Sequence, residues 1–86
     1  MDDESIIALF FARSEQAISE VKDKYGWACT SIAYRILSSI EDSEECVSDA
    51  LLCAWNTIPP ERPAYLKAYL EKITRNQAIM RKRSMQ

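Results

Sequence analysis

The chain of 86 residues contains no histidine and only one glycine. Without histidine it lacks the usual general base of Ser–His or Cys–His catalysis, and a zinc site would need thiolates and carboxylates alone. One glycine also leaves no room for a glycine-rich phosphate loop, and it gives few of the turns that sheets require. The sequence predicts a protein that is not an enzyme, with no catalytic residues, no cofactor and no metal.

Cysteine and long apolar runs are also scarce. The three cysteines have no CxxC spacing, and their odd number does not suit a disulfide framework, so we expect reduced thiols. The N-terminus Met1-Asp2-Asp3-Glu4 is acidic where a signal peptide is basic. No apolar run reaches the roughly 18 residues of a membrane span. We expect a cytoplasmic protein without a membrane span.

The residues that are present favour one folded, helical domain over residues 1–86. Hydrophobic residues make up 48% of the chain and charged residues 28%, a balance typical of folded rather than disordered chains. The net charge of −2 is unevenly distributed. Residues 1–60 hold four Lys/Arg against eleven Asp/Glu, a charge of −7, whereas residues 61–86 hold seven against two, a charge of +5. We expect the two parts to face different partners.

Apolar spacing predicts an all-α fold, a compact bundle of about four helices. The first is expected from about residue 5 to 25, where Gly26 interrupts it, and the second from about 27 to 37. Asp42 or Ser43 is expected to cap a third helix that ends near Thr57. After a proline-rich loop, Pro63 suits the first turn of a fourth helix that ends near Lys82. Its expected buried stripe is Leu66, Leu70, Ile73, Gln77 and Met80.

The polar half of the third helix contains one apolar residue, Leu52. At 100° per residue, Glu45, Ser48 and Asp49 surround it. A single exposed leucine is ordinary on a protein surface. The same layout is also that of a small protein-binding patch whose acidity selects a basic partner.

The fourth helix carries a second stripe beside its predicted core stripe: Tyr69, Lys72, Asn76, Ile79 and Arg83, with Arg62 and Tyr65 at its N-terminal end. Cations can bind phosphates, aromatic rings can stack on unpaired bases, and an amide can hydrogen-bond a base edge. Lysine and arginine are also common on solvated helix faces. From this stripe alone, both interpretations stay open.

Three motifs resemble the extracytoplasmic-function (ECF) subfamily of bacterial sigma-70-type sigma factors, in their region 2. The segment 42–55, DSEECVSDALLCAW, resembles the signature in which an acidic cluster leads to an Ala-Trp pair. The segment 69–76, YLEKITRN, resembles the later signature Trp-Leu-x-x-Ile-x-x-Asn, and Arg81-Lys82-Arg83 resembles the basic tail that follows it. Upstream, the segment 33–37, AYRIL, resembles the Ala-x-x-x-Leu helix of the family. The likeness extends over about residues 6–83 without a gap.

The resemblance implies a function in transcription initiation. The third helix would bind the clamp helices of the β′ subunit of RNA polymerase, through the positions Asp42, Glu44, Glu45, Ser48, Asp49 and Leu52. The loop and the fourth helix would recognise and melt the −10 promoter element by capturing its non-template strand, through Arg62, Tyr65, Tyr69, Lys72, Arg75, Asn76, Ile79 and Arg83. An anti-sigma factor is a further partner class compatible with the resemblance.

The chain departs from the family pattern at several positions. Ser48 replaces the usual Gln, Leu51 an aromatic residue and Tyr69 a Trp, and the loop lacks the common phenylalanine and glycine. The helix-turn-helix domain of region 4, which follows in complete factors, is not in this chain. Two alternatives remain: an interaction module that binds polymerase or a regulator without melting DNA, and a helix-turn-helix domain. The proline-rich loop suits the second poorly.

Overall fold

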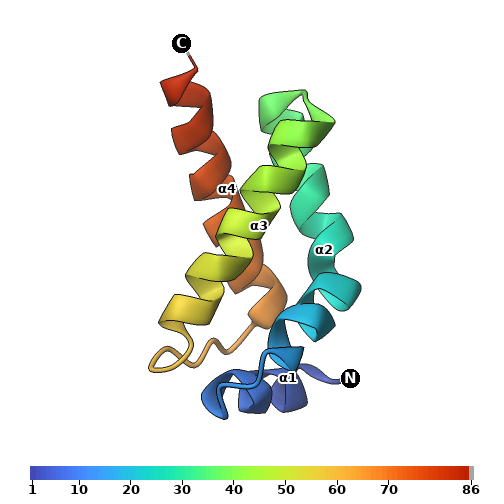
Figure 1. Cartoon of the computed structure of the whole chain (residues 1–86), viewed down its shortest axis with the longest axis vertical. Coiled ribbons are helices and arrows are strands. Elements are labelled where there is room, and N and C mark those ends of the chain that lie inside the picture. Colours follow the sequence, from blue (N-terminus) through green and yellow to red (C-terminus); the bar gives the residue numbers. More distant parts are fainter. Residues whose placement is uncertain (86) are drawn as a thin grey trace.

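The computed structural model describes residues 1–85, which form helices and connections and no strand. The helices are α1 (Asp3–Phe11), α2 (Gln16–Leu37), α3 (Ile40–Thr57) and α4 (Leu66–Ser84). Figure 1 shows α2, α3 and α4 packed along one another with alternating direction, whereas α1 lies across the end where α2 begins. The expected all-α bundle of four helices is confirmed.

Side chains cap the first and third helices. The Asp2 carboxylate accepts a hydrogen bond from the backbone N–H of Ser5 at 2.8 Å, and the Ser39 hydroxyl accepts one from Asp42 at 3.2 Å. The expected cap at Asp42 or Ser43 is therefore wrong, because α3 begins earlier, at Ile40. Ser43 is instead buried in the first turn, where its hydroxyl donates to the Ser39 carbonyl at 2.6 Å.

The predicted break at Gly26 is also wrong, because α2 continues through it. Glycine inside a helix costs about 0.5–1 kcal/mol relative to alanine, and the buried residues Val21 and Cys29 on either side offset this cost. The chain breaks instead between α1 and α2, where Arg13 adopts a φ of 56°. The first predicted helix is therefore two helices, and α2 absorbs the second predicted helix up to its expected end at Leu37.

The third helix ends at Thr57, as expected, and the proline-rich loop spans residues 58–65. The fourth helix starts at Leu66 rather than at Pro63, which is a further correction. Tyr65, with φ −129° and ψ 96°, is extended, so the preceding residues cannot join the helix. Ile58 and Leu66 are both buried, and the loop between them lies at the same end of the bundle as α1 (Figure 1).

The buried stripe of α4 is partly different from the predicted one. Leu66 and Leu70 are buried as expected, but Thr74 and Ala78 follow them. Ile73 is half-buried and packs against the core, so its prediction is confirmed in part. Gln77 is half-buried and Met80 is 52% exposed, so the prediction of these two as core residues is wrong. Residues four apart lie only about 40° apart on a helix, so the four buried residues form one stripe, which faces α2 and α3. The Thr74 hydroxyl is satisfied by the Leu70 carbonyl at 2.8 Å.

Candidate functional site

The acidic face of α3 has the layout that the sequence predicts. We use this name for Asp42, Glu44, Glu45, Ser48, Asp49 and Leu52. The opposite side of the helix is buried in the bundle, which turns these residues outward; all but the half-buried Asp42 are exposed. Leu52 is 57% exposed. It lies between two shallow grooves, one lined by Ile18 and Trp55 and the other by Asn56 and Gln77.

One cation from α4 contacts this acidic face. The guanidinium of Arg81 lies 3.1 Å from the Asp49 carboxylate, 3.7 Å from that of Glu45 and 4.0 Å from that of Asp42. From the sequence, Arg81 is expected only in the basic tail. It lies three residues after Ala78 and seven after Thr74, on the side of α4 that faces α3. Helical spacing relates Arg81 to these residues but does not indicate the carboxylates that it meets. The acidic face is therefore partly neutralised within the chain.

The basic face of α4 lies on the side of the helix away from the core. We use this name for Lys72, Asn76, Ile79 and Arg83, which follow one another at intervals of three or four residues and are all exposed. A groove of 540 Å³ runs beside them between α3 and α4, lined by Cys53, Ile73, Asn76, Gln77, Ile79, Met80 and Arg83. The predicted stripe therefore has cations and an amide at the edge of an open, partly apolar groove.

The other predicted DNA-binding residues lie apart from this face. Arg62 turns to α1, where it pairs with Glu4 at 3.2 Å and lies 5.2 Å from the centre of the Phe11 ring. Tyr69 is half-buried, and its hydroxyl donates to that of Thr57 at 2.8 Å. Tyr65, in contrast, is 79% exposed just before α4. Only Tyr65 of the two tyrosines therefore offers a ring to solvent.

Arg75 lines a groove between α2 and α4, on a different side of α4 from the groove beside Asn76. The groove beside Arg75 also contains Trp27, Arg35 and Lys67. The Trp27 ring is 67% exposed, with the Lys67 ammonium 5.7 Å from its centre. This cluster is not predicted from the sequence, where residue 27 stands only as an expected helix start, because nothing along the chain indicates that residues 27 and 67 are neighbours.

Two of the three cysteines, Cys29 and Cys46, are buried in the bundle. Burial raises the pKa of the Cys29 and Cys46 thiols, which keeps them protonated and unreactive. Within residues 1–85, no group of three or more His, Cys, Asp or Glu residues is placed to hold a metal ion. No helix in this part of the chain has the length and apolarity needed to cross a membrane.

Residues 23–86 match the family model described as sigma-70 region 2. The match covers α3, α4 and most of α2, and leaves out α1 and the turn that contains Arg13. No curated protein and no solved structure matches the chain.

Proposed function

The chain belongs to the sigma-70 region 2 family, the sigma-factor domains of transcription initiation, and on this premise we propose how it acts. Its acidic face docks on the β′ clamp helices of RNA polymerase, and its loop and basic face hold the non-template strand of the −10 promoter element. The supporting observation is that two outward faces of opposite charge lie on adjacent helices inside the matched range. We also propose that the chain belongs to the ECF subfamily and acts in the cytoplasm, and that residues 1–86 as a whole form the region 2 domain.

Docking is supported by the composition of the acidic face. An apolar residue, Leu52, is surrounded by carboxylates, as in small interfaces with an apolar centre and a polar rim. Carboxylates at the rim favour a basic partner and speed the encounter with it. Arg81 already pairs with Glu45 and Asp49, so a basic partner must either share these carboxylates or displace the guanidinium.

Strand capture is supported by the basic face. Lys72 and Arg83 can neutralise phosphates, and the amide of Asn76 between them can hydrogen-bond a base edge. The exposed ring of Tyr65 can stack on an unpaired base. Opening duplex DNA costs a few kcal/mol per unstacked base, and these contacts offset that cost without any bond chemistry.

An interaction module that binds polymerase or a regulator, an anti-sigma factor included, without melting DNA is the second candidate. Two observations favour it: Arg62 is paired with Glu4, and the Tyr69 hydroxyl is bonded to Thr57. Both groups are therefore engaged inside the domain rather than presented to a strand. This candidate keeps the acidic face and predicts that the basic face has no role in promoter opening.

A pull-down with the isolated β′ clamp-helix fragment tests the docking. We expect the wild-type domain to bind and the Glu45→Lys/Asp49→Lys variant to lose about a hundredfold or more in affinity, because it places like charges against a basic partner. The control is Glu20→Lys/Asp23→Lys on α2, which makes the same change in net charge away from the acidic face. If the folded wild type fails to bind at micromolar concentration, or if both variants lose binding equally, the docking proposal is wrong.

A further inference from the structure

The N-terminal segment outside the family match contacts the proline-rich loop. Residues 1–22 comprise α1, the turn after it and the start of α2, and the loop of residues 58–65 lies against them at one end of the bundle (Figure 1). The contacts are made at two points, by Arg13 at the start of the loop and by α1 at its middle.

Arg13 holds the end of α3. One nitrogen of its guanidinium, Nη1, donates to the carbonyl of Trp55 at 2.8 Å and to that of Ile58 at 2.9 Å. The guanidinium carbon lies 3.7 Å from the centre of the Trp55 ring, in a stacked position. The last carbonyls of a helix have no partner within the helix, and a cation there also complements the helix dipole. Arg13 therefore adds a side-chain cap to the C-terminal end of α3.

The backbone of the turn is shaped to present this side chain. Arg13 has a φ of 56°, in the left-handed region that L-residues other than Gly, Asn and Asp seldom adopt. The turn is bonded back onto α1, because Arg13 N–H donates to the Phe10 carbonyl at 3.0 Å and Ser14 N–H to that of Leu9 at 2.9 Å. An arginine is thus held in an unusual conformation where its side chain reaches the far helix.

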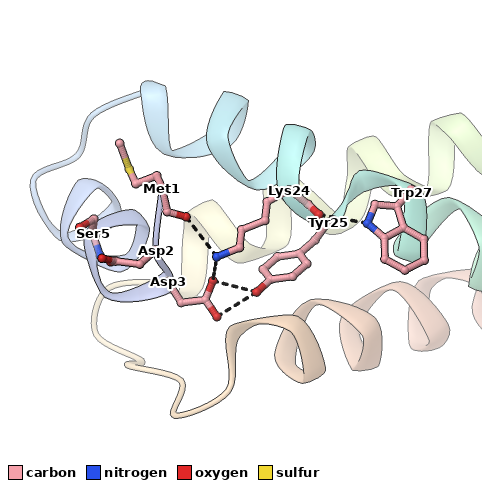
Figure 2. A network of polar contacts seen from close by, with 7 residues as sticks. All are labelled: Met1, Asp2, Asp3, Ser5, Lys24, Tyr25 and Trp27. Carbon is pink, nitrogen blue, oxygen red and sulfur yellow. Dashed lines mark hydrogen bonds and ion pairs between the residues drawn. The ribbon is translucent and has the colours of Figure 1, made fainter.

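The contact at the middle of the loop is of a different kind. Arg62 pairs with Glu4 at 3.2 Å, but both side chains are largely exposed, so a phosphate can replace the carboxylate. Helix α1 itself is fastened to α2. The Lys24 ammonium lies 2.9 Å from the Asp3 carboxylate, and the Tyr25 hydroxyl donates to the same carboxylate at 2.8 Å (Figure 2). The start of the loop is therefore fixed, while the pairing of Arg62 can change.

From this geometry we propose that Arg13 is a positioning residue for strand capture. By fixing the Trp55 and Ile58 carbonyls, it sets where the loop leaves α3 and so where Tyr65 and the start of α4 stand. It acts through the loop and touches neither polymerase nor DNA. The inference rests on the proposed function for its consequence, but the positioning of the loop can be measured in the protein alone.

Hydrogen exchange of the full chain tests the positioning. The informative amides are those of Ile58 and Glu61, which donate to the Ala54 and Thr57 carbonyls, both at 2.9 Å. In Arg13→Met, which keeps the stem and removes the donors, we expect these amides to exchange on the order of tenfold faster, while core amides of α2 stay unchanged. Arg13→Lys, which restores a charged donor, should lie between Arg13→Met and wild type.

The matched control is Arg35→Met, the same change at an exposed residue of α2 away from the loop. Equal exchange of Ile58 and Glu61 in Arg13→Met and in Arg35→Met would overturn the proposal. If Arg13→Met unfolds, all amides exchange faster, and Arg13→Lys then decides: protection lost at Ile58 and Glu61 alone supports the positioning role, and wild-type protection of both amides overturns it. Loss throughout α2 and α3 in Arg13→Lys would make Arg13 a general stability residue and overturn it.

A second measurement connects the loop to function. RNA polymerase core carrying each variant is incubated with DNA that contains a short unpaired bubble. The displaced strand of this bubble has a randomised sequence. We expect Arg13→Met to retain roughly tenfold less of this DNA than Arg35→Met, with binding to the β′ fragment within about twofold of wild type. Parallel loss of both activities would contradict a role confined to the loop. If the wild type itself retains no DNA, the proposed function is wrong. The hydrogen-exchange experiment then still tests whether Arg13 positions the loop.

Discussion

The outward sides of α3 and α4 are opposites in charge, although the two helices pack along each other. α3 contains no lysine or arginine, whereas α4 contains six of these cations and a single acidic residue, Glu71. The unequal charge of the two parts of the sequence thus becomes two surfaces in space. Among residues 1–85, every ion pair between these helices involves Arg81. The two surfaces can therefore act separately except at this residue.

Alanine substitutions in the basic face test whether the two faces act separately. We expect the largest effect from this change. Replacing Lys72, Asn76 and Arg83 with alanine removes the two proposed phosphate contacts and the proposed base contact, and should lower retention of the bubble DNA by polymerase about a hundredfold. Binding to the β′ fragment should remain within about twofold, because none of the three contacts α3 carboxylates. Unchanged DNA retention or unchanged transcription would favour the interaction module instead. Retention is measured at two salt concentrations, since loss of phosphate contacts also reduces the salt dependence.

Arg81 connects the two faces, so its replacement should change binding by the acidic face, although by less than the loss expected for the basic face. Arg81→Gln removes the guanidinium from Glu45 and Asp49 and should strengthen binding to the β′ fragment by about two- to fivefold, the size expected for exposed pairs. Lys82→Gln is the control, since it changes the net charge equally from an exposed position outside this network. Affinities are compared by titration at equal salt. Weaker binding in Arg81→Gln than in Lys82→Gln would mean that the guanidinium supports the docking face rather than competing for it.

The elements that could be predicted from sequence are those set by local pattern. Buried and exposed residues of α3 alternate at helical spacing, so its outward face and its end at Thr57 are as expected. The boundary between α1 and α2 could not be found this way, because Arg13 makes its decisive contacts with Trp55 and Ile58, more than forty residues away. Gly26 was misleading, because packing on both sides of it outweighs its poor helix propensity.

The same limit applies to the candidate site. The clustering of Lys72, Asn76, Ile79 and Arg83 follows from helical spacing alone and was predictable. The pairing of Arg62 depends on Glu4, and that of Arg81 on another helix, so neither could be read from neighbouring residues. Long charged side chains choose partners by tertiary proximity, and this is why sequence reasoning located the faces more accurately than their individual contacts.

The ion pair between Lys24 and Asp3 lies at the other end of the bundle, away from both charged faces. We expect its removal to have the smallest effect. The hydrogen bond from Lys24, together with that from Tyr25, holds the pKa of Asp3 below its usual value of about 3.9. Because the folded-state pKa is lowered, the carboxylate stabilises the fold above about pH 4, and this stabilisation is lost as the pH falls through the folded-state pKa.

Asp3→Asn should therefore lower the Tm at pH 7 by a few degrees at most, since the pair is partly exposed. The difference from wild type should shrink as the pH falls below about 4 and disappear once Asp3 is protonated in both the folded and the unfolded state. Asp23→Asn, an exposed carboxylate of α2, serves as the control in the same thermal melts. Unlike Arg81→Gln, Asp3→Asn should leave binding to the β′ fragment unchanged. A deficit in Tm that persists undiminished at pH 2 would show that Asp3 acts by its shape or hydrogen bonds and not by its charge.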